Sequence, residues 1–288
     1  MAVSVSLINM KGGVGKTTVA AQLAHACGRK NLRTLAIDLD PQANLSQALL
    51  SPENYVKHLR NKKPTIVQIF DHYLPPGDAG GSPRPVKVRD IIVKEVGYWA
   101  NSTLDLIPSR LELSQILKKP RGKERRLAHA LSSVADDYDL ILIDCAPTES
   151  ILTEAAYHAS RYALVPVKPE YLATIGLPLL ARSLRDFKDE NGDRTLDICG
   201  IVFNHSSSYS TSGPEGKRAV REVRAEARKN GWNVYDTSVR YSASYAKSAR
   251  EGTPIGLTSY ARWNVRTEFA VFVKEFLKSI GLNQEEST

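Results

Sequence analysis

Residues 9–20, NMKGGVGKTTVA, carry the residue types that hold phosphate groups in proteins. A glycine-rich stretch lets successive backbone N–H groups converge on phosphate oxygens, while the lysine and hydroxyl that follow serve the terminal phosphates and Mg²⁺. This stretch lies between the apolar run 3–9 and the helical pattern 16–29, which is the strand–loop–helix order that a phosphate-binding loop requires. It departs from the usual G-x-x-x-x-G-K-[ST] pattern in two places, because Met10 replaces the first glycine and Lys11 precedes the others.

The pattern predicts which groups of this loop would contact a nucleotide. Lys16 is expected to reach the β- and γ-phosphates, and the Thr17 hydroxyl is expected to bind Mg²⁺. The alternative is a glycine-rich turn that only tightens a strand–helix junction, and the letters G-K-T-T after a strand disfavour it. The predicted contacts in the loop are Gly12, Gly13, Val14, Gly15, Lys16, Thr17 and Thr18.

Apolar runs of strand length alternate with helix-length segments along the chain, and these elements must position the loop. Strands are predicted over 3–9, 34–40, 103–109, 139–147, 162–167 and 196–204, and helices near 16–29, 123–136, 174–190 and 264–280. Several runs are continuously apolar, as expected for strands covered by helices on both faces. The alternation predicts an α/β fold with a doubly wound, mainly parallel sheet. Residues 1–288 are expected to form a single domain with an irregular insertion at about 51–102.

Three aspartates lie at the ends of two predicted strands. Asp38 and Asp40 end the run LAIDLD and share one side of an extended chain. Asp144 ends the apolar part of DLILIDCAP, where a carboxylate can hold a water molecule of Mg²⁺. Doubly wound sheets bind ligands at the carboxyl ends of their strands, so we expect these carboxylates beside the phosphate loop. For Asp38 and Asp40, which precede a proline, a helix-capping turn is the alternative.

The form K-G-G-V-G-K-T-T resembles the deviant Walker A motif of the ParA/MinD family of ATPases. Further segments that resemble this family are LAIDLDPQANLSQAL (35–49), DLILIDCAPTES (139–150), VPVKPEYLATIGLPLL (165–180) and SAREGTPI (248–255). The resemblance therefore runs from residue 1 to about residue 260, and it is weak over 51–102. The chain departs from the family at 146–149, where A-P-T-E replaces the usual P-P-S-L. The resemblance implies a single P-loop ATPase domain that uses ATP and Mg²⁺.

The resemblance also implies a role for individual residues. Lys11 is the family's signature lysine, which reaches across a nucleotide-sandwich homodimer to the phosphates of the partner's ATP; a solvated surface lysine is the alternative. Asp40 is implied to orient or activate the attacking water, while Asp38 supports the Mg²⁺ shell. Asn204 is a candidate neighbour of adenine, although strands also end in Asn for turn reasons. The predicted catalytic residues are thus Lys11, Lys16 and Asp40, the metal residues are Thr17, Asp38 and Asp144, and Lys11 and Asn204 join the nucleotide contacts.

Positive charge is concentrated in one segment of the chain. The net charge is +8, and residues 217–250 contain nine Lys and Arg against three acids. Within the helical pattern 213–232, five of these cations fall within about 120° of a helical wheel, which suits contacts to a phosphate backbone without sequence reading. A solvated helix face is the alternative. The predicted DNA-binding residues are Lys217, Arg218, Arg221, Arg224, Arg228, Arg240, Lys247 and Arg250, with Arg262 and Arg266 as extensions.

The resemblance, together with the basic segment, implies a ParA-like, Soj-like partition ATPase without an N-terminal helix-turn-helix domain. It is expected to form an ATP-bound homodimer, to bind nucleoid DNA non-specifically and to hydrolyse ATP when a ParB-like or cargo-adaptor protein stimulates it, which segregates or positions a plasmid, a chromosome or a protein assembly. A MinD-like membrane ATPase is the alternative, but the acidic end NQEEST disfavours membrane binding. A metabolic P-loop enzyme and an iron–sulfur dimer are further alternatives. Three separate cysteines and the lack of a leader predict a cytoplasmic, nucleoid-associated protein.

Overall fold

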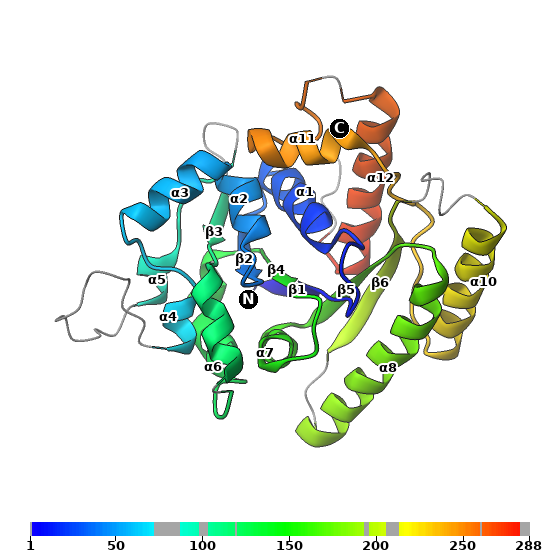
Figure 1. Ribbon diagram of the computed structural model, residues 1–288, viewed down its shortest axis with the longest axis horizontal. Coiled ribbons are helices and arrows are strands. Elements are labelled where there is room, and N and C mark those ends of the chain that lie inside the picture. The colour runs from blue at the N-terminus through cyan, green and yellow to red at the C-terminus, as the bar shows by residue number, and fades with distance from the viewer. Residues whose placement is uncertain are drawn as a thin grey trace.

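The computed structural model describes residues 2–71, 87–97, 103–118, 120–192, 196–205, 213–259 and 261–282. Six strands form one sheet in the order β3-β2-β4-β1-β5-β6 (Figure 1). They are β1 (Val3–Leu7), β2 (Thr34–Leu39), β3 (Leu104–Ile107), β4 (Leu140–Cys145), β5 (Tyr162–Val167) and β6 (Asp197–Phe203). All neighbouring strands in this sheet are parallel, so the predicted α/β fold and its six strands are confirmed.

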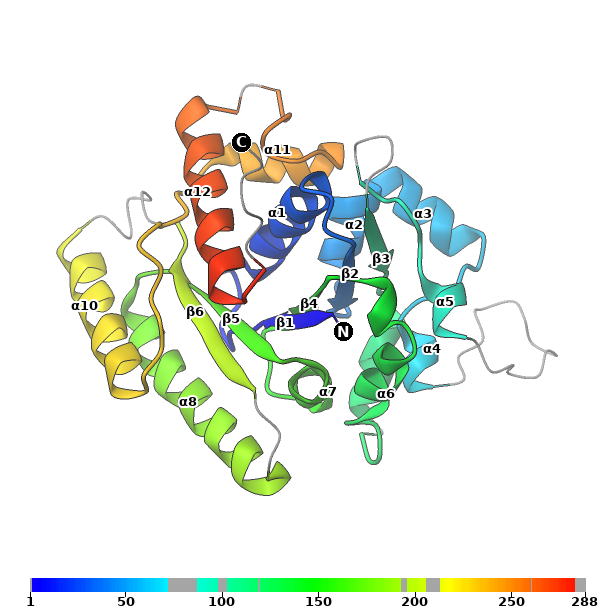
Figure 2. The same ribbon diagram turned by 180° about the vertical axis from the view of Figure 1, so that it is seen from behind.

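Helices cover both faces of the sheet (Figures 1 and 2). One face is covered by α1 (Lys16–Arg29), α2 (Asn44–Leu50), α11 (Ala243–Glu251) and α12 (Trp263–Ser279), and the other by α6 (Arg126–Ser132), α7 (Ile151–Ala159) and α8 (Tyr171–Asn191). The helix α10 (Pro214–Lys229) packs against α8 beyond the β6 edge. The helices predicted at 16–29, 174–190, 213–232 and 264–280 are present, whereas the one predicted at 123–136 is confined to α6 and a short 3₁₀ turn, Ala135–Asp137.

The continuously apolar strands are explained by two cores, one on each side of the sheet. In β4, Ile141 and Ile143 belong to the core under α7 and α8, while Leu140 and Leu142 belong to the core under α1 and α12. Successive side chains of a strand point to opposite faces, so a strand that is covered on both faces has no polar side to show. The same packing leaves the ends of the strands as the place for polar groups.

The region 51–102 is more regular than predicted over its described parts. It contains α3 (Pro52–Arg60), α4 (Val67–Phe70) and α5 (Val88–Ile91), and a 3₁₀ segment, Leu111–Lys118, follows β3. The stretch TIVQIFDHYL (65–74) has a helical pattern, but within the described chain only the four residues of α4 are helical. The turn-rich stretch 75–85 and the acidic end at 283–288 lie outside the described residues. Across the described helices, none is both long and apolar enough to cross a bilayer.

The parallel sheet brings the predicted site residues to one edge. The phosphate loop follows β1, Asp40 follows β2, and Asp144 lies near the end of β4. In the register of the sheet, Asp38 of β2 lies opposite Asp144, and Asp144 lies opposite Leu7 of β1. Parallel neighbours end at the same edge, which explains how residues more than 100 positions apart come together.

Candidate nucleotide-binding site

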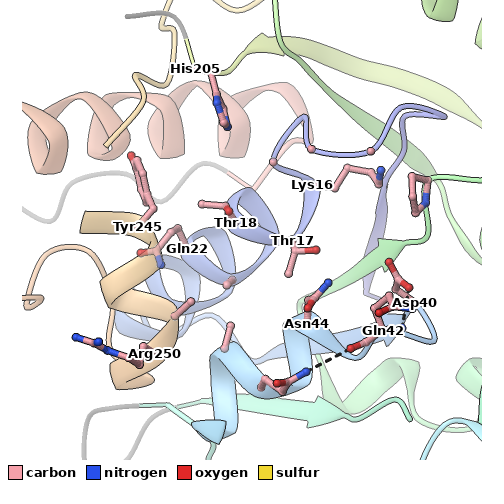
Figure 3. Close-up of a pocket in the computed structure, with 18 of the residues that line it drawn as sticks. Lys16, Thr17, Thr18, Gln22, Asp40, Gln42, Asn44, His205, Tyr245 and Arg250 are labelled. Atoms are coloured by element: carbon pink, nitrogen blue, oxygen red, sulfur yellow. Dashed lines mark hydrogen bonds between the residues drawn. The ribbon is translucent and has the colours of Figure 1, made fainter. Parts of the chain in front are cut away.

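A cavity of about 610 Å³ opens over this edge of the sheet (Figure 3). The phosphate loop and the first turns of α1 form one wall, α2 and Asp40 form a second, and α11 forms a third. Its volume falls in the range of about 300–1,000 Å³ that is usual for small-molecule sites. The lining includes the predicted residues Gly12, Gly13, Gly15, Lys16, Thr17, Thr18 and Asp40.

The backbone of the phosphate loop requires glycine at two positions. Gly13 and Gly15 have φ angles of +74° and +91°, in the left-handed region that side chains disfavour. A Cβ atom on Gly15 would also come within 1.9 Å of the Asn204 side-chain nitrogen. Gly15 is therefore required both by its backbone conformation and by its close approach to Asn204. Because Gly15 has no side chain, the start of α1 stays open towards the cavity.

Lys16 lies beneath the loop, with only 6% of its surface exposed. Its ammonium group donates hydrogen bonds to the carbonyls of Asn9, at 2.9 Å, and Lys11, at 3.3 Å. Burial lowers the pKa of Lys16, while the nearby Asp144 and Asp40 oppose that effect. A cation held in this way is positioned for an anionic ligand before the ligand arrives.

Thr17 and Asp144 meet where a magnesium ion would be needed. The Thr17 hydroxyl donates a 2.6 Å hydrogen bond to one carboxylate oxygen of Asp144, whose other oxygen is buried and has no hydrogen-bond partner among the described residues. Burial and the nearby Asp38 raise the pKa of Asp144. A divalent cation would offset both effects, so this donor set fits Mg²⁺. Although no described group of three His, Cys, Asp or Glu side chains could hold a metal, Mg²⁺ next to phosphates needs only one or two carboxylates.

Asp38 and Asp40 differ in their surroundings. Asp38 is fully buried, and one of its oxygens accepts 2.7 Å hydrogen bonds from both the amide and the hydroxyl of Ser46 in α2. Asp38 thus satisfies an amide in the first turn of α2 from a distance, whereas the residue that caps α2 is Ala43, which makes no side-chain capping bond. Burial raises the pKa of Asp38 to about 7. Asp40 instead lines the cavity, where one of its oxygens accepts a 2.9 Å hydrogen bond from the amide of Gln42 (Figure 3).

Asn204 contacts the loop from the end of β6. Its side-chain nitrogen donates to the carbonyl of Val14 at 2.8 Å, and its oxygen accepts from the amide of His205 at 2.8 Å. The nitrogen thus holds the phosphate loop, while the oxygen is engaged by the backbone that follows β6. In this arrangement Asn204 supports the loop from below, and it is buried.

Several cavity residues carry no sequence signal. Gln22 of α1 donates to the hydroxyl of Ser248 at 2.8 Å and accepts from the amide of Ile255 at 2.7 Å, which ties the segment 248–255 to the helix after the phosphate loop. Tyr245 and His205 complete the far end of the cavity (Figure 3). These contacts join residues more than 180 positions apart, which local patterns do not reveal.

Lys11 points away from the cavity that its own loop forms. It is absent from the cavity lining, and its ammonium group makes an ion pair with Glu170, the residue before α8. The Lys11 amide donates to the Asn9 side chain at 2.9 Å, and Asn9 in turn donates to the carbonyl of Pro166 in β5 at 2.9 Å. Lys11 is thus held by an acidic partner, not simply solvated.

The predicted DNA-binding cations divide into two groups. On α10, Arg218 pairs with Glu222 at 2.8 Å and Arg224 lies over the ring of Phe203, whereas three others are exposed and make no ion pair with the described residues. Those three are Lys217, Arg221 and Arg228. The second group lies around α11 and α12, where Arg240 and Lys247 pair with acids and Arg250 borders the cavity, with its guanidinium turned away from the phosphate loop (Figure 3). The two groups lie in separate parts of the fold (Figure 1).

The three cysteines bear on the iron–sulfur alternative. Cys27, Cys145 and Cys199 are all buried, and all three thiols are free. Burial raises the pKa of Cys27 and of Cys199 to about 12. Such thiols remain protonated and are poor metal ligands, so the arrangement does not favour a cluster held by cysteines.

Comparisons with known proteins agree with this geometry. A family profile described as an AAA domain matches residues 2–198. The chromosome-partitioning ATPase Soj of Treponema pallidum is 29% identical over 250 residues, which cover 86% of this chain and 87% of Soj. The residues matched by the profile include the phosphate loop, the two aspartate-bearing strands and α8.

Solved structures share the fold at lower identity. Apo McdA from Cyanothece has a TM-score of 0.75 and 21% identity, covering 96% of this chain and all of McdA. A putative plasmid partition protein from Borrelia burgdorferi, bound to AMPPNP, has a TM-score of 0.73 and 21% identity, covering 96% of this chain and 99% of that one. With its family match, its Soj-like sequence and this phosphate loop, the chain belongs to the ParA/MinD family of deviant Walker A ATPases.

Proposed function

We propose that this protein is a ParA-like, Mg²⁺-dependent ATPase that forms an ATP-sandwich homodimer and binds DNA non-specifically. A ParB-like or cargo-adaptor protein stimulates hydrolysis, and hydrolysis releases the DNA. The cycle positions or segregates a plasmid, a chromosome or a protein assembly on the nucleoid, in the cytoplasm. Residues 1–288 act as one ATPase unit.

The observation that carries this proposal is the placement of the two loop lysines. Lys16 lies under the loop and lines the cavity, whereas Lys11 is absent from the cavity lining and pairs with Glu170. A lysine that is turned away from its own cavity and yet adjoins the phosphate loop is explained by a role at the cavity of a second chain. ATP binding would then be coupled to dimerisation, since each chain completes the site of the other.

The residues in and around the cavity have separate roles in phosphoryl transfer. Lys16 binds the β- and γ-phosphates, and Thr17 and Asp144 hold the metal. When bound between these two side chains, Mg²⁺ would supply positive charge that offsets the charge developing on the transferred phosphoryl group. Asp40 has an oxygen free of the Gln42 amide, with which it orients the attacking water. Asp38 sets the position of Asp40, because its carboxylate accepts from the Asp40 amide at 3.2 Å.

The exposed cations of α10 supply the DNA contact. Lys217, Arg221 and Arg228 lie along one helix at spacings of four and seven residues, so they share a face. Cations without acidic partners are available to phosphates at no cost of breaking an ion pair. A row of this kind reads no base edges, so the binding is non-specific and depends on salt.

Co-sedimentation with DNA of random sequence tests the proposal directly. We expect binding with ATP and Mg²⁺, much weaker binding with ADP or without nucleotide, and a loss of at least about tenfold in affinity between 50 and 200 mM salt. The control is Lys16→Ala, which should abolish the response to ATP. Binding that ignores nucleotide or salt, or sedimentation with anionic liposomes in place of DNA, would contradict it.

A further inference from the structure

A second cavity of about 610 Å³ lies between α1 and α12, two helices that pack side by side on one face of the sheet (Figure 2). It is lined by residues of α1 between 22 and 30, of the segment 254–256 and of α12 between 263 and 274, and we call it the α1–α12 groove. Gln22 borders both this groove and the nucleotide cavity, whereas the phosphate loop and Asp40 border only the latter. The groove is therefore a separate cavity, and its volume is in the range usual for small-molecule sites.

The helical repeat brings the lining residues of each helix to one side. Residues three and four apart are neighbours on the surface of a helix. The lining positions follow this spacing on both helices, so each helix presents a single side to the groove. These positions include 263, 266, 270 and 274 on α12, and 22, 26 and 29 on α1.

The floor of the groove is apolar. Ile255, Phe269 and Val273 line it and are only 5%, 3% and 2% exposed, so they belong to the core beneath. Trp263 lines the same groove but is 78% exposed, which places its indole at the rim. An exposed indole beside a buried apolar floor suits a flat aromatic ring, which can stack on the one and pack on the other.

The lining carries positive charge and, among the described residues, no negative charge. Four cations line the groove, two from each helix. They are Arg29, Lys30, Arg266 and Lys274. The two acids of α12 are engaged elsewhere, because Glu268 pairs with Arg240 at 2.8 Å. Glu275 accepts from the amide of Thr237 at 3.2 Å. Neither acid therefore offsets the charge of the groove from within its lining.

Each of these cations can serve a ligand in addition to the contacts that it already makes. Arginine has five N–H donors and lysine has three. Arg266, for example, donates from its Nε to the carbonyl of Ala261 at 3.0 Å, and the N–H groups of its two terminal nitrogens are further donors. Hydrogen bonds from such charged groups to an anion are stronger than those between neutral groups. The charge of the lining therefore favours an anionic ligand.

We propose that the α1–α12 groove is a second ligand site, and that its ligand is a small organic anion with an aromatic ring. The ring packs on the floor beside Trp263, and the acidic group pairs with Arg266 and the other cations. A neutral ring would leave this positive charge without a counter-charge, and a DNA backbone would gain nothing from a buried apolar floor. The site needs neither the dimer nor the DNA contact of the proposed function, so it goes beyond that function.

Titration with the fluorescent anion 8-anilinonaphthalene-1-sulfonate tests the site. Excess ADP and Mg²⁺ are present, so that the nucleotide cavity is already filled, and the wild type should bind a single probe molecule per chain. Ala270→Trp, which fills the groove with an indole, should weaken binding by at least about tenfold, because the probe loses its apolar contacts. The matched control is Val271→Trp, outside the groove lining on α12, where the side chain is 45% exposed. It should bind the probe as the wild type does.

A charge reversal tests whether the groove selects an anion. Arg266→Glu should weaken binding of the sulfonate by at least about tenfold, since repulsion replaces a charge-assisted hydrogen bond. The neutral probe N-phenyl-1-naphthylamine has the same rings without the sulfonate, and its binding should not respond to Arg266→Glu. Lys278→Glu is the matched control, because Lys278 is an exposed lysine of α12 outside the groove lining. It should leave binding of the sulfonate unchanged.

The outcomes separate this site from other occupants of the groove. Loss of sulfonate binding in Ala270→Trp and Arg266→Glu, with both controls unchanged, supports the site. Binding that is absent, or that is seen only without ADP and thus in the nucleotide cavity, overturns it. Displacement of the probe by duplex DNA overturns it in favour of DNA. Binding that tightens several-fold when Glu285 and Glu286 are both replaced by Gln overturns it in favour of the chain's own acidic segment.

Discussion

The carboxyl edge of the sheet and the outer face of α10 hold charge in opposite ways. At the edge, Lys16, Asp38 and Asp144 are buried, and each is fixed by named hydrogen bonds. On α10, Lys217 and Arg228 face solvent with no acid beside them among the described residues. Removal of one group at the edge therefore disturbs the hydrogen-bonded positions of its neighbours in the site. Removal of one cation on α10 only lowers the total positive charge of that helix face. We expect all-or-none effects at the edge and graded, salt-sensitive effects on α10.

The largest effect is expected from Asp40→Ala at the edge. The variant should hydrolyse ATP about 10²–10⁴ times more slowly, because a positioned general base contributes that much to proton transfer. Its ATP binding should persist, since Asp40 does not hold the phosphates, and the protein should stay on DNA. Phosphate release and DNA dissociation are the measurements.

Asp189→Ala is the matched control for Asp40→Ala. Asp189 is an exposed aspartate near the end of α8, away from the cavity lining. This variant should hydrolyse ATP and leave DNA at the wild-type rate. Rapid hydrolysis or rapid DNA release by Asp40→Ala would show that the catalytic carboxylate lies elsewhere.

A second prediction concerns His25, which lies in the buried part of α1 behind the phosphate loop. Burial lowers the pKa of His25 to about 4, whereas an exposed histidine of the unfolded chain titrates near 6.5. The unfolded chain therefore binds the extra proton at a higher pH than the folded chain does. As a result, the free energy of unfolding falls by up to about 3 kcal/mol as the pH falls from 6.5 to 4. His25→Leu removes this dependence. Urea unfolding of both proteins at several pH values within this range measures the difference.

The comparison with His25→Leu isolates one group among several that titrate. Asp38 acts in the opposite direction, because its raised pKa of about 7 favours the folded state at low pH and disfavours it as the pH rises from about 4 to 7. That contribution is present in both proteins and cancels in the difference. Parallel pH profiles for the wild type and the variant would contradict the assignment.

The phosphate loop and the strands could be predicted from sequence because their signals are local. The apolar runs specify strands covered on both faces, and Gly13 and Gly15 stand where the backbone needs a left-handed conformation. Parallel pairing then places Asp38 and Asp144 opposite each other without any further information. Both the fold and the meeting of Lys16, Thr17, Asp40 and Asp144 follow from these local rules.

The partners of charged side chains from distant segments could not be predicted in this way. Lys11 and Glu170 are 159 positions apart in the chain, and nothing in either segment marks them as a pair. Likewise, one run of basic residues from Lys217 to Arg250 divides between α10 and α11 once the chain is folded. Arg218 and Lys247 pair with acids four residues further along their own helices, which the sequence could have indicated, whereas Arg240 pairs with Glu268 of α12 only in the tertiary structure.

The smallest effect is expected on α10, whose exposed cations were compared above with the carboxyl edge of the sheet. Replacement of Lys217, Arg221 and Arg228 by alanine should weaken DNA binding by the ATP-bound protein about tenfold at moderate salt. Each lost phosphate contact also lowers the slope of log affinity against log salt by about one, so the slope should fall by about three in total. Filter binding across a salt series measures both quantities.

Arg218→Ala is the control for this triple variant, since Arg218 already pairs with Glu222 and should change the slope by less than one unpaired cation does. Nucleotide binding should match the wild type in both variants, because α10 lies outside the cavity lining. An unchanged salt slope in the triple variant, with ATP-dependent DNA binding intact, would move the DNA contact from α10 to the cations around α11. That result would also remove the contrast between the carboxyl edge and α10. The cations around α11 already pair with acids or border the nucleotide cavity. DNA binding there would therefore depend on fixed side-chain positions, as the chemistry at the carboxyl edge does.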